Sequence, residues 1–216
     1  MPQNNPYHVY YVDVHTMSAL LHAKSCDLIT RLAVLFHDIG KPHSYQDDEN
    51  GIRHFKGHGK VSAEMTDVIM RRLKFDNDTR EKVVQLVLHH DFEIPTNKKL
   101  IKRWLNKIGK EQFLRLLNVK EADIKAQNPA YIERLDDMYG VYVDLDEIFE
   151  DEECFSLKDL AINGEDIMRA MYIKPGKDVG YWLNEILQLV IDGSLPNDKD
   201  KLIEYMVGIA DGWIKG

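Results

Sequence analysis

The spacing of apolar residues along the chain predicts a protein built almost entirely of helices. Between about residues 16 and 40, apolar positions follow helical spacing in two successive segments, and Gly40 with Pro42 ends the second one. Similar patterns recur at about 58–73, 78–90, 97–107, 110–125 and 129–149. No series of strands alternates with these segments, so the sequence predicts a mostly α fold.

Two polar segments interrupt the helical pattern. The run from Asp47 to Gly51 has the composition of a turn between two short extended arms, which predicts one small β-hairpin. The acidic stretch from Asp144 to Glu153 is the best candidate for a domain boundary, and shorter helical patterns follow it from Gly164 onwards. We therefore expect a first domain over residues 1–150 and a short helical tail over residues 151–216.

The composition is that of an ordinary soluble globular protein. Of the 216 residues, 44% are hydrophobic and 30% are charged, and the formal net charge is -8. This charge argues against non-specific nucleic-acid binding by the whole surface. The apolar runs are too short for a membrane span, and the segment from Met1 to Pro6 lacks the features of a signal peptide. Cys26 and Cys154 have no CxxC spacing, which favours a reducing, cytoplasmic environment.

The adjacent pair His37-Asp38 is the centre of the candidate chemistry. It ends an apolar stretch, and four more histidines and an aspartate fall in or beside other predicted helices. These residues are His15, His58, His89, His90 and Asp123. Imidazoles and carboxylates so far apart in the sequence meet only if helices pack around a common centre, and such convergence indicates a metal site. Mixed nitrogen and oxygen ligands suit Mn, Fe, Ni, Co, Zn or Mg and do not select among these metals.

The neighbours of this pair suggest how a substrate would be held. Lys41 follows His37 by one helical turn, so we expect it to share that face and to bind an anionic substrate oxygen. His58, with His89 or His90, would hold a second metal or contact the substrate, and the sequence leaves open which of the adjacent pair faces inward. Taken singly, each histidine is more often a core or surface residue; the order of the whole set favours a site.

The order His … His-Asp … Asp, from Val9 to about Gln127, resembles the HD-domain superfamily of metal-dependent phosphohydrolases. The resemblance implies an HD-type helical bundle in which four residues bind the metal: His15, His37, Asp38 and Asp123. It also implies that His58, His89 and His90 lie at the site, and that Asp38, Lys41 and His58 take part in catalysis. The family often has Glu after the histidine that matches His58, whereas this chain has Gly59.

A second resemblance covers the tail. Residues 157–168, 173–180, 183–187 and 193–197 resemble the C-terminal region of bacterial tRNA nucleotidyltransferases, the CCA-adding enzymes. In that family an HD-type module precedes this region, so the two resemblances are collinear. The Gly-rich turn and paired carboxylates of the family's polymerase head are not matched in this sequence. Asp144-Leu145-Asp146 resembles the carboxylate pair only in its letters and is typical of a solvated helix face. The resemblance therefore implies an HD module with its tail and without nucleotide addition.

A basic segment between Lys98 and Arg115 is the candidate nucleic-acid interface. Lys102 and Arg103 lie beside Trp104, and positive charge next to a stacking ring suits single-stranded or looped nucleic acid. The alternative is that Trp104 is a core residue and that the basic side chains are merely solvated.

The function implied by the resemblance is divalent-metal-dependent hydrolysis of a phosphate on a nucleotide or an RNA end. A 2′,3′-cyclic phosphate or a 2′-phosphate is the specific expectation. The alternatives are another nucleotide phosphohydrolase, acting on deoxynucleotides or signalling nucleotides, and a non-catalytic RNA-binding module. The sequence predicts neither the metal nor the oligomeric state.

Overall fold

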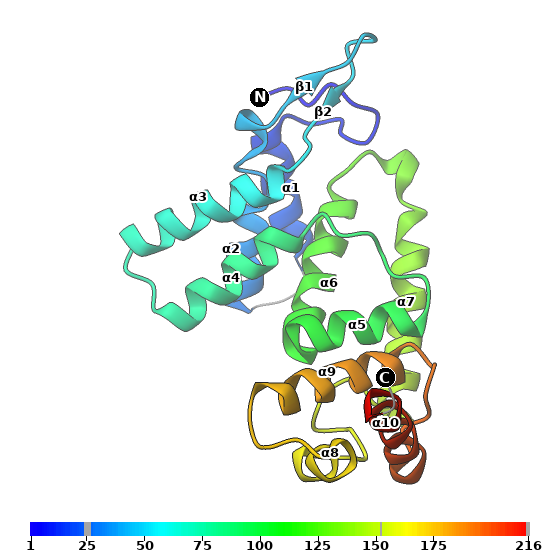
Figure 1. Cartoon of the computed structure of the whole chain (residues 1–216). Coiled ribbons are helices and arrows are strands. Elements are labelled where there is room, and N and C mark those ends of the chain that lie inside the picture. The colour runs from blue at the N-terminus through cyan, green and yellow to red at the C-terminus, as the bar shows by residue number, and fades with distance from the viewer. Residues whose placement is uncertain (24–26, 152, 215–216) are drawn as a thin grey trace. The chain divides into compact units, whose positions relative to one another are not determined.

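The fold of this protein, a computed structural model, is mostly α as the sequence predicts. The structure describes residues 1–23, 27–151 and 153–214, without the side chains of 212–214, and these contain ten α-helices and one two-stranded hairpin (Figure 1). The chain forms two compact units: Met1–Ile94 with Lys110–Gly140, and Pro95–Gly109 with Val141–Gly216. The domains expected at 1–150 and 151–216 remain a prediction; the compact units have these different bounds.

The first unit contains five α-helices and the hairpin. Its helices are α1 (Val12–His22), α2 (Leu28–Phe36), α3 (His58–Arg72), α4 (Asn77–His89) and α6 (Lys110–Lys125), with short 3-10 helices η1 (Lys41–His43) and η2 (Pro129–Tyr131). The Asp27 carboxylate caps α2 by accepting a hydrogen bond from the Thr30 N–H at 2.9 Å. Helix α2 ends at Phe36 rather than near Gly40, so His37 is its C-cap and Asp38 lies just beyond it.

Apolar side chains from α2, α3, α4 and α6 form the core of this unit. The largest fully buried ones are Met70, Leu86, Phe113, Leu116 and Leu117. Burial of each such side chain stabilises the fold by about 1.5–3 kcal/mol. Helices α3 and α4 lie side by side (Figure 1). Their packing with α2 brings the end of α2, the start of α3 and the end of α4 to one place, and that place is the candidate site.

The predicted hairpin is confirmed. Strands β1 (Gln46–Asp47) and β2 (Arg53–His54) pair antiparallel, and Gly51 in the turn has a φ of 75°, a left-handed conformation that favours glycine. Residues 1–11, which we call the N-terminal wall, lie beside the hairpin, because the Arg53 N–H donates to the Asn4 carbonyl at 3.0 Å. The Asn128 N–H also donates to the Tyr7 carbonyl at 2.8 Å, so the wall is anchored from two sides.

The second unit is a smaller helical assembly. It contains α5 (Lys98–Ile108), α8 (Gly164–Met171), α9 (Lys177–Ile191) and α10 (Lys199–Ile214), and α7 (Arg134–Glu150) enters it at Val141. Ile167, Ile186 and Leu187 are fully buried in its core. Most of the acidic stretch that was expected to mark a boundary belongs to α7, where Leu145 is buried and Asp146 is exposed.

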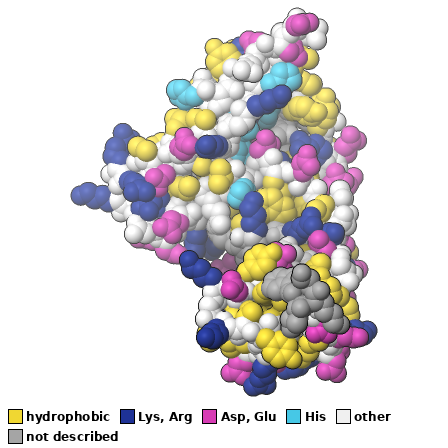
Figure 2. All heavy atoms as spheres, in the orientation of Figure 1, with side chains coloured by type: hydrophobic (Ala, Val, Ile, Leu, Met, Phe, Trp, Pro, Cys, Tyr) yellow, Lys and Arg dark blue, Asp and Glu magenta, His cyan; other side chains and the backbone are white. Residues whose placement is uncertain are grey.

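The surface charges, the helices and the cysteines can be compared with the predictions from composition. Acidic and basic side chains are interspersed over the visible face (Figure 2). No described helix combines the length and the apolar composition that a membrane crossing requires. Cys154 is a free, buried thiol whose pKa is raised to about 11 by burial, and Cys26 lies outside the described residues.

Candidate metal centre

Six of the predicted site residues meet in the first unit. They come from five parts of the chain: His15 in α1, His37 and Asp38 at the end of α2, His58 at the start of α3, His90 after α4, and Asp123 in α6. All six are buried. Their ligand atoms fall into two groups, each within 4.8 Å: His15, His37 and Asp123, and Asp38, His58 and His90. The convergence expected from the sequence is therefore present in the fold.

Asp38 belongs to the second group and also contacts the first. Its Oδ2 is 3.2 Å from His37 Nε2, and its Oδ1 is 3.4 Å from His58 Nε2. Within the first group, His15 Nε2 is 3.0 Å from Asp123 Oδ1. One carboxylate is thus placed to bridge two neighbouring sites.

Backbone carbonyls orient all four imidazoles in the same way. His37, His58 and His90 each place Nδ1 2.7 Å from a carbonyl three residues earlier in the chain. His15 Nδ1 lies 3.2 Å from the Ala126 carbonyl. A carbonyl only accepts hydrogen bonds, so each Nδ1 carries a proton and each Nε2 is left to face the centre.

The resulting contacts between imidazoles call for positive charge. Nε2 of His15 is 3.3 Å from Nε2 of His37, and Nε2 of His58 is 2.9 Å from Nε2 of His90. Two lone pairs facing each other at these distances repel unless a proton or a cation lies between them. In metal-binding histidines the ring nitrogen that does not bind the metal usually donates its proton to a backbone carbonyl or a carboxylate, as Nδ1 does here.

The lowered pKa values of the two carboxylates also favour binding of a cation. Burial raises the pKa of Asp38, but nearby His37 and Lys41 outweigh it and hold this pKa well below its usual value. Burial likewise opposes ionisation of Asp123, and its hydrogen bond to His15 helps to keep its pKa well below the usual value. Burial lowers the pKa of His90 and favours its neutral form. Two buried, ionised carboxylates beside four imidazoles are a donor set that fits a divalent metal.

Lys41 reaches the centre, but not along the predicted helix face. It begins η1, and its buried Nζ forms an ion pair with Asp38 Oδ2 at 2.7 Å. Nζ also donates to Gln3 Oε1 at 2.8 Å and lies 3.4 Å from His8 Nε2. The ammonium is therefore engaged by three side chains of the protein. Its direct contact with a substrate oxygen stays a prediction that this geometry does not favour.

The choice between the two adjacent histidines is clear in the structure. His90 points into the centre, whereas His89 is partly exposed and belongs to neither group of ligand atoms. Gly59, which follows His58, lets the end of α4 lie close to the start of α3. A Cβ at this position would lie 3.2 Å from the Leu88 carbonyl oxygen and 3.6 Å from a ring carbon of His90.

The predicted nucleic-acid residues lie on α5 in the second unit. Lys102 Nζ is 2.8 Å from Glu153 Oε2, and the Arg103 guanidinium is 2.9 Å from Asp192 Oδ1. Trp104 is partly buried, with Lys107 Nζ 4.7 Å from its ring centroid. Both basic side chains are ion-paired within their own unit, and contact with nucleic acid remains a prediction.

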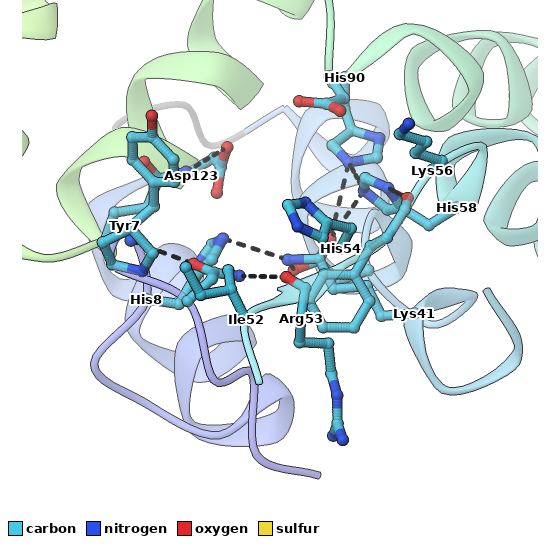
Figure 3. Close-up of a pocket in the computed structure, with 16 residues that line it drawn as sticks. Tyr7, His8, Lys41, Ile52, Arg53, His54, Lys56, His58, His90 and Asp123 are labelled. Atoms are coloured by element: carbon cyan, nitrogen blue, oxygen red, sulfur yellow. Dashed lines mark hydrogen bonds and ion pairs between the residues drawn. The ribbon is translucent and has the colours of Figure 1, made fainter. Parts of the chain in front are cut away.

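A cavity of about 440 Å³ opens beside the candidate metal ligands, and some residues that line it were not predicted from the sequence. Tyr7 and His8 lie on the side of Asp123, opposite His58 and His90 (Figure 3). Burial, and then Lys41, lower the pKa of His8 to about 3, so this ring is neutral. His8 lies in the non-helical N-terminal wall, where no helical spacing marks a functional residue.

Comparisons with known proteins identify the family. A model described as tRNA nucleotidyltransferase domain 2 matches residues 44–206, which is most of the chain. The chain belongs to the tRNA nucleotidyltransferase domain 2 family. The resemblance of the tail to these enzymes is thereby confirmed. The family match begins after His37-Asp38, so it includes His58, His90 and Asp123 but not the first ligands.

Several curated members of this enzyme group are similar to the chain. The CC-adding tRNA nucleotidyltransferase of Thermus thermophilus is 30% identical over 185 residues, which cover 83% of this chain and 41% of that protein. The A-adding tRNA nucleotidyltransferase of Deinococcus radiodurans is 27% identical over 171 residues, with coverages of 78% and 39%. The chain thus spans about two fifths of the length of these relatives.

Proposed function

We propose that this chain is a divalent-metal-dependent phosphohydrolase of the HD type that acts on nucleotides or RNA ends. The observation that carries the proposal is the placement of Asp38, which belongs to one group of inward-facing ligand atoms and contacts the other. His15, His37, Asp38 and Asp123 would hold one metal ion, and His58 and His90 would share Asp38 in holding a second. Metal ions so held would supply activation of water and stabilisation of negative charge on a phosphoryl group.

The remaining residues prepare the site for this chemistry. The carbonyls that accept from each Nδ1 keep the imidazoles in one tautomer and one orientation. Lys41 keeps Asp38 ionised and holds its carboxylate in place. The adjoining cavity leaves space for a phosphate and part of a nucleoside next to the ligands.

The substrate class rests on the family. Relatives of this chain are named for adding nucleotides to tRNA, which supports an RNA end or a nucleotide as the substrate. A 2′,3′-cyclic phosphate or a 2′-phosphate at such an end is the specific proposal. Water adds to phosphorus and one phosphorus–oxygen bond breaks, which opens the cyclic ester or releases inorganic phosphate.

The test is hydrolysis of 2′,3′-cyclic AMP and of adenosine 2′-monophosphate with Mn, Ni, Co, Mg, Fe or Zn supplied in turn. Asp38→Asn keeps the side-chain volume and removes the carboxylate, while exposed Asp137→Asn in the same unit is the matched control. We expect metal-dependent turnover that Asp38→Asn abolishes and Asp137→Asn preserves. Turnover of deoxynucleotides alone would retain the phosphohydrolase and replace the substrate.

A second candidate function is favoured by the family membership itself. A module of a tRNA enzyme can serve by binding RNA, and then the buried histidines would only stabilise helix packing. RNA binding that survives Asp38→Asn, with no turnover of any tested phosphate by the wild type, would favour this candidate.

A further inference from the structure

A second hollow adjoins the metal-lined cavity within the first unit. It has a volume of about 470 Å³, and Tyr7, His8 and Gln127 line both hollows. Tyr131 and Arg134 line only the second one. A ligand bound at the metal centre can therefore extend past these shared residues toward Arg134.

His8 presents an unused hydrogen-bond donor at this junction. Lys41 is a donor only, so its contact with His8 Nε2 at 3.4 Å requires that nitrogen to accept. Nδ1 of the same ring then carries a proton, and this buried nitrogen has no hydrogen-bond partner among the residues that the structure describes. A buried donor without a partner costs free energy, and an acceptor oxygen from a ligand would remove that cost.

Arg134 supplies the positive charge of the second hollow. Its Nη1 donates to Gln127 Oε1 at 2.8 Å, and Gln127 Nε2 donates to Asp123 Oδ2 at 3.1 Å. Within the described part of the chain, no carboxylate forms an ion pair with this partly buried guanidinium. Asp91, the acidic residue of the hollow, faces Lys120 Nζ at 3.7 Å. Arg134 is thus free to bind an anion while Gln127 holds it at a fixed separation from a metal ligand.

Two aromatic rings line this hollow, and that of Tyr7 lies near the guanidinium. The centroids of Tyr7 and Tyr131 are 4.7 Å apart, and the Arg134 guanidinium carbon is 6.0 Å from the centroid of Tyr7. Exposed aromatic faces beside an arginine suit a nucleobase together with its phosphate better than they suit an isolated inorganic anion. The exposed face of Tyr7 therefore points to a nucleotide ligand.

We propose that His8 and Arg134 bind a second phosphate group of the substrate, one that is not hydrolysed. This inference rests on the proposed function for the position of the first phosphate. The carboxamide of Gln127, with its hydrogen bonds of 2.8 Å to Arg134 and 3.1 Å to Asp123, separates the two side chains by a distance that the sugar of a nucleoside with two phosphates can span. The ligand class is thus a nucleoside bearing phosphates on both sides, either a free bisphosphate or the last nucleotide of an RNA strand.

The experiment compares three ligands by titration calorimetry on the full chain. They are adenosine 3′-monophosphate, adenosine 3′,5′-bisphosphate, and a dinucleotide whose last residue carries the same 3′-phosphate. Titrations are run with Mn²⁺ and repeated with EDTA, where metal-dependent hydrolysis does not consume the ligand. Arg134→Gln keeps a polar group near Gln127, Arg134→Lys keeps the charge, and exposed Arg71→Gln in α3 is the control for loss of charge.

We expect the wild type to bind the bisphosphate or the dinucleotide at least about tenfold more tightly than the monophosphate, the range of one charged hydrogen bond. Arg134→Gln should bring this ratio close to one without changing the affinity for the monophosphate. Arg134→Lys should restore part of the ratio, and Arg71→Gln should leave it unchanged. Preference for the dinucleotide over the bisphosphate would assign the subsite to RNA, and the reverse to free nucleotides.

The proposal is overturned by a wild-type ratio near one or by no detectable binding of any ligand with two phosphates. It is also overturned if Arg134→Gln weakens all three ligands and Mn²⁺ equally, because Arg134 would then only position Asp123 through Gln127. A preserved ratio without hydrolysis of any phosphate would instead reject the proposed function and leave this subsite standing.

Discussion

The candidate metal centre of the first unit and helix α5 of the second unit are both rich in charged side chains, yet the partners of those side chains differ. At this candidate centre the charged groups are buried, and imidazole nitrogens face each other, as Nε2 of His58 and Nε2 of His90 do at 2.9 Å. On α5 the basic side chains are partly exposed, and Lys102 and Arg103 meet carboxylates within their own unit. Buried nitrogen atoms that face each other indicate a cation between them, whereas exposed and paired charges are accounted for by the fold itself.

The largest expected effect comes from removing the central carboxylate. Asp38→Asn should lower Mn²⁺ affinity by more than about 100-fold, since even an outer-shell change at metal sites costs about 10–100-fold. Asp192→Asn, which removes a carboxylate paired with α5, should leave that affinity unchanged. Calorimetric titration of both variants with Mn²⁺ measures the difference. Equal affinities in the two variants would remove the distinction between the regions.

His89 and His90 are adjacent in the chain but differ in their expected effect on metal binding. His90→Ala should weaken metal binding by at least about tenfold, because it removes an inward-facing Nε2. His89→Ala should change metal affinity little, since His89 lies outside both groups of ligand atoms. Thermal unfolding of both variants without metal checks that each is folded. A larger loss in His89→Ala would reverse the assignment of the inner histidine.

Gly40 packs closely against the start of α3, and a substitution there tests how tightly this part of the candidate metal centre is packed. A Cβ at this position would lie 2.5 Å from the backbone nitrogen of Ser62 and 2.8 Å from the carbonyl oxygen of His58. Gly40→Ala must push the start of α3 away and should lower the free energy of unfolding by about 1–3 kcal/mol. The control is Gly180→Ala in α9, where a Cβ meets nothing within 4 Å and should raise that free energy by about 0.5–1 kcal/mol. Urea unfolding of both variants measures the two values.

The smallest effect is expected at the ion pairs of α5, and it depends on pH. Burial opposes ionisation of Glu153 and Asp192, but their basic partners outweigh it and lower both pKa values. The pairs therefore add stability above the unfolded carboxyl pKa of about 4, and this is lost as the pH falls through the lowered folded values. Glu153→Gln with Asp192→Asn should reduce the free energy of unfolding by about 0–1 kcal/mol per pair at pH 7.

Urea unfolding at pH 7 and near pH 2.5 tests this dependence. The difference between the wild type and the double variant should shrink at the lower pH, because both wild-type carboxylates approach their neutral forms there. High salt should also reduce the difference at pH 7, since exposed pairs are screened. A difference that stays constant with pH would contradict an electrostatic origin.

Local chemistry made much of the fold predictable from the sequence. Asp27 as a cap, the turn ending at Gly51 and the start of α8 at Gly164 all depend on residues close together in the chain. The convergence of the histidines was also expected, because His37-Asp38 lies at a helix end. The roles of Lys41 and Lys102 were harder to infer, since their partners Gln3 and Glu153 are far away in the sequence. Long-range pairing decides whether a lysine is available to a ligand, and a local pattern does not contain it.

His8 and Arg134 illustrate the same limit at the candidate site. His8 has no helical spacing around it, and its free Nδ1 depends on a contact with Lys41. Arg134 depends on Gln127, which lies in the turn after α6 and donates a hydrogen bond to Asp123, so no helical spacing marks this pair.

The N-terminal wall has a consequence for how this protein is made. Its anchors at Arg53 and Asn128 join the first residues to chain that is synthesised much later. Contacts of such large sequence separation form slowly compared with helices, so we expect α1 to α4 to pack before the wall closes. The cavity that His8 lines would be completed only when residue 128 has emerged and folded back. Ligand binding would then report that the whole first unit has finished folding.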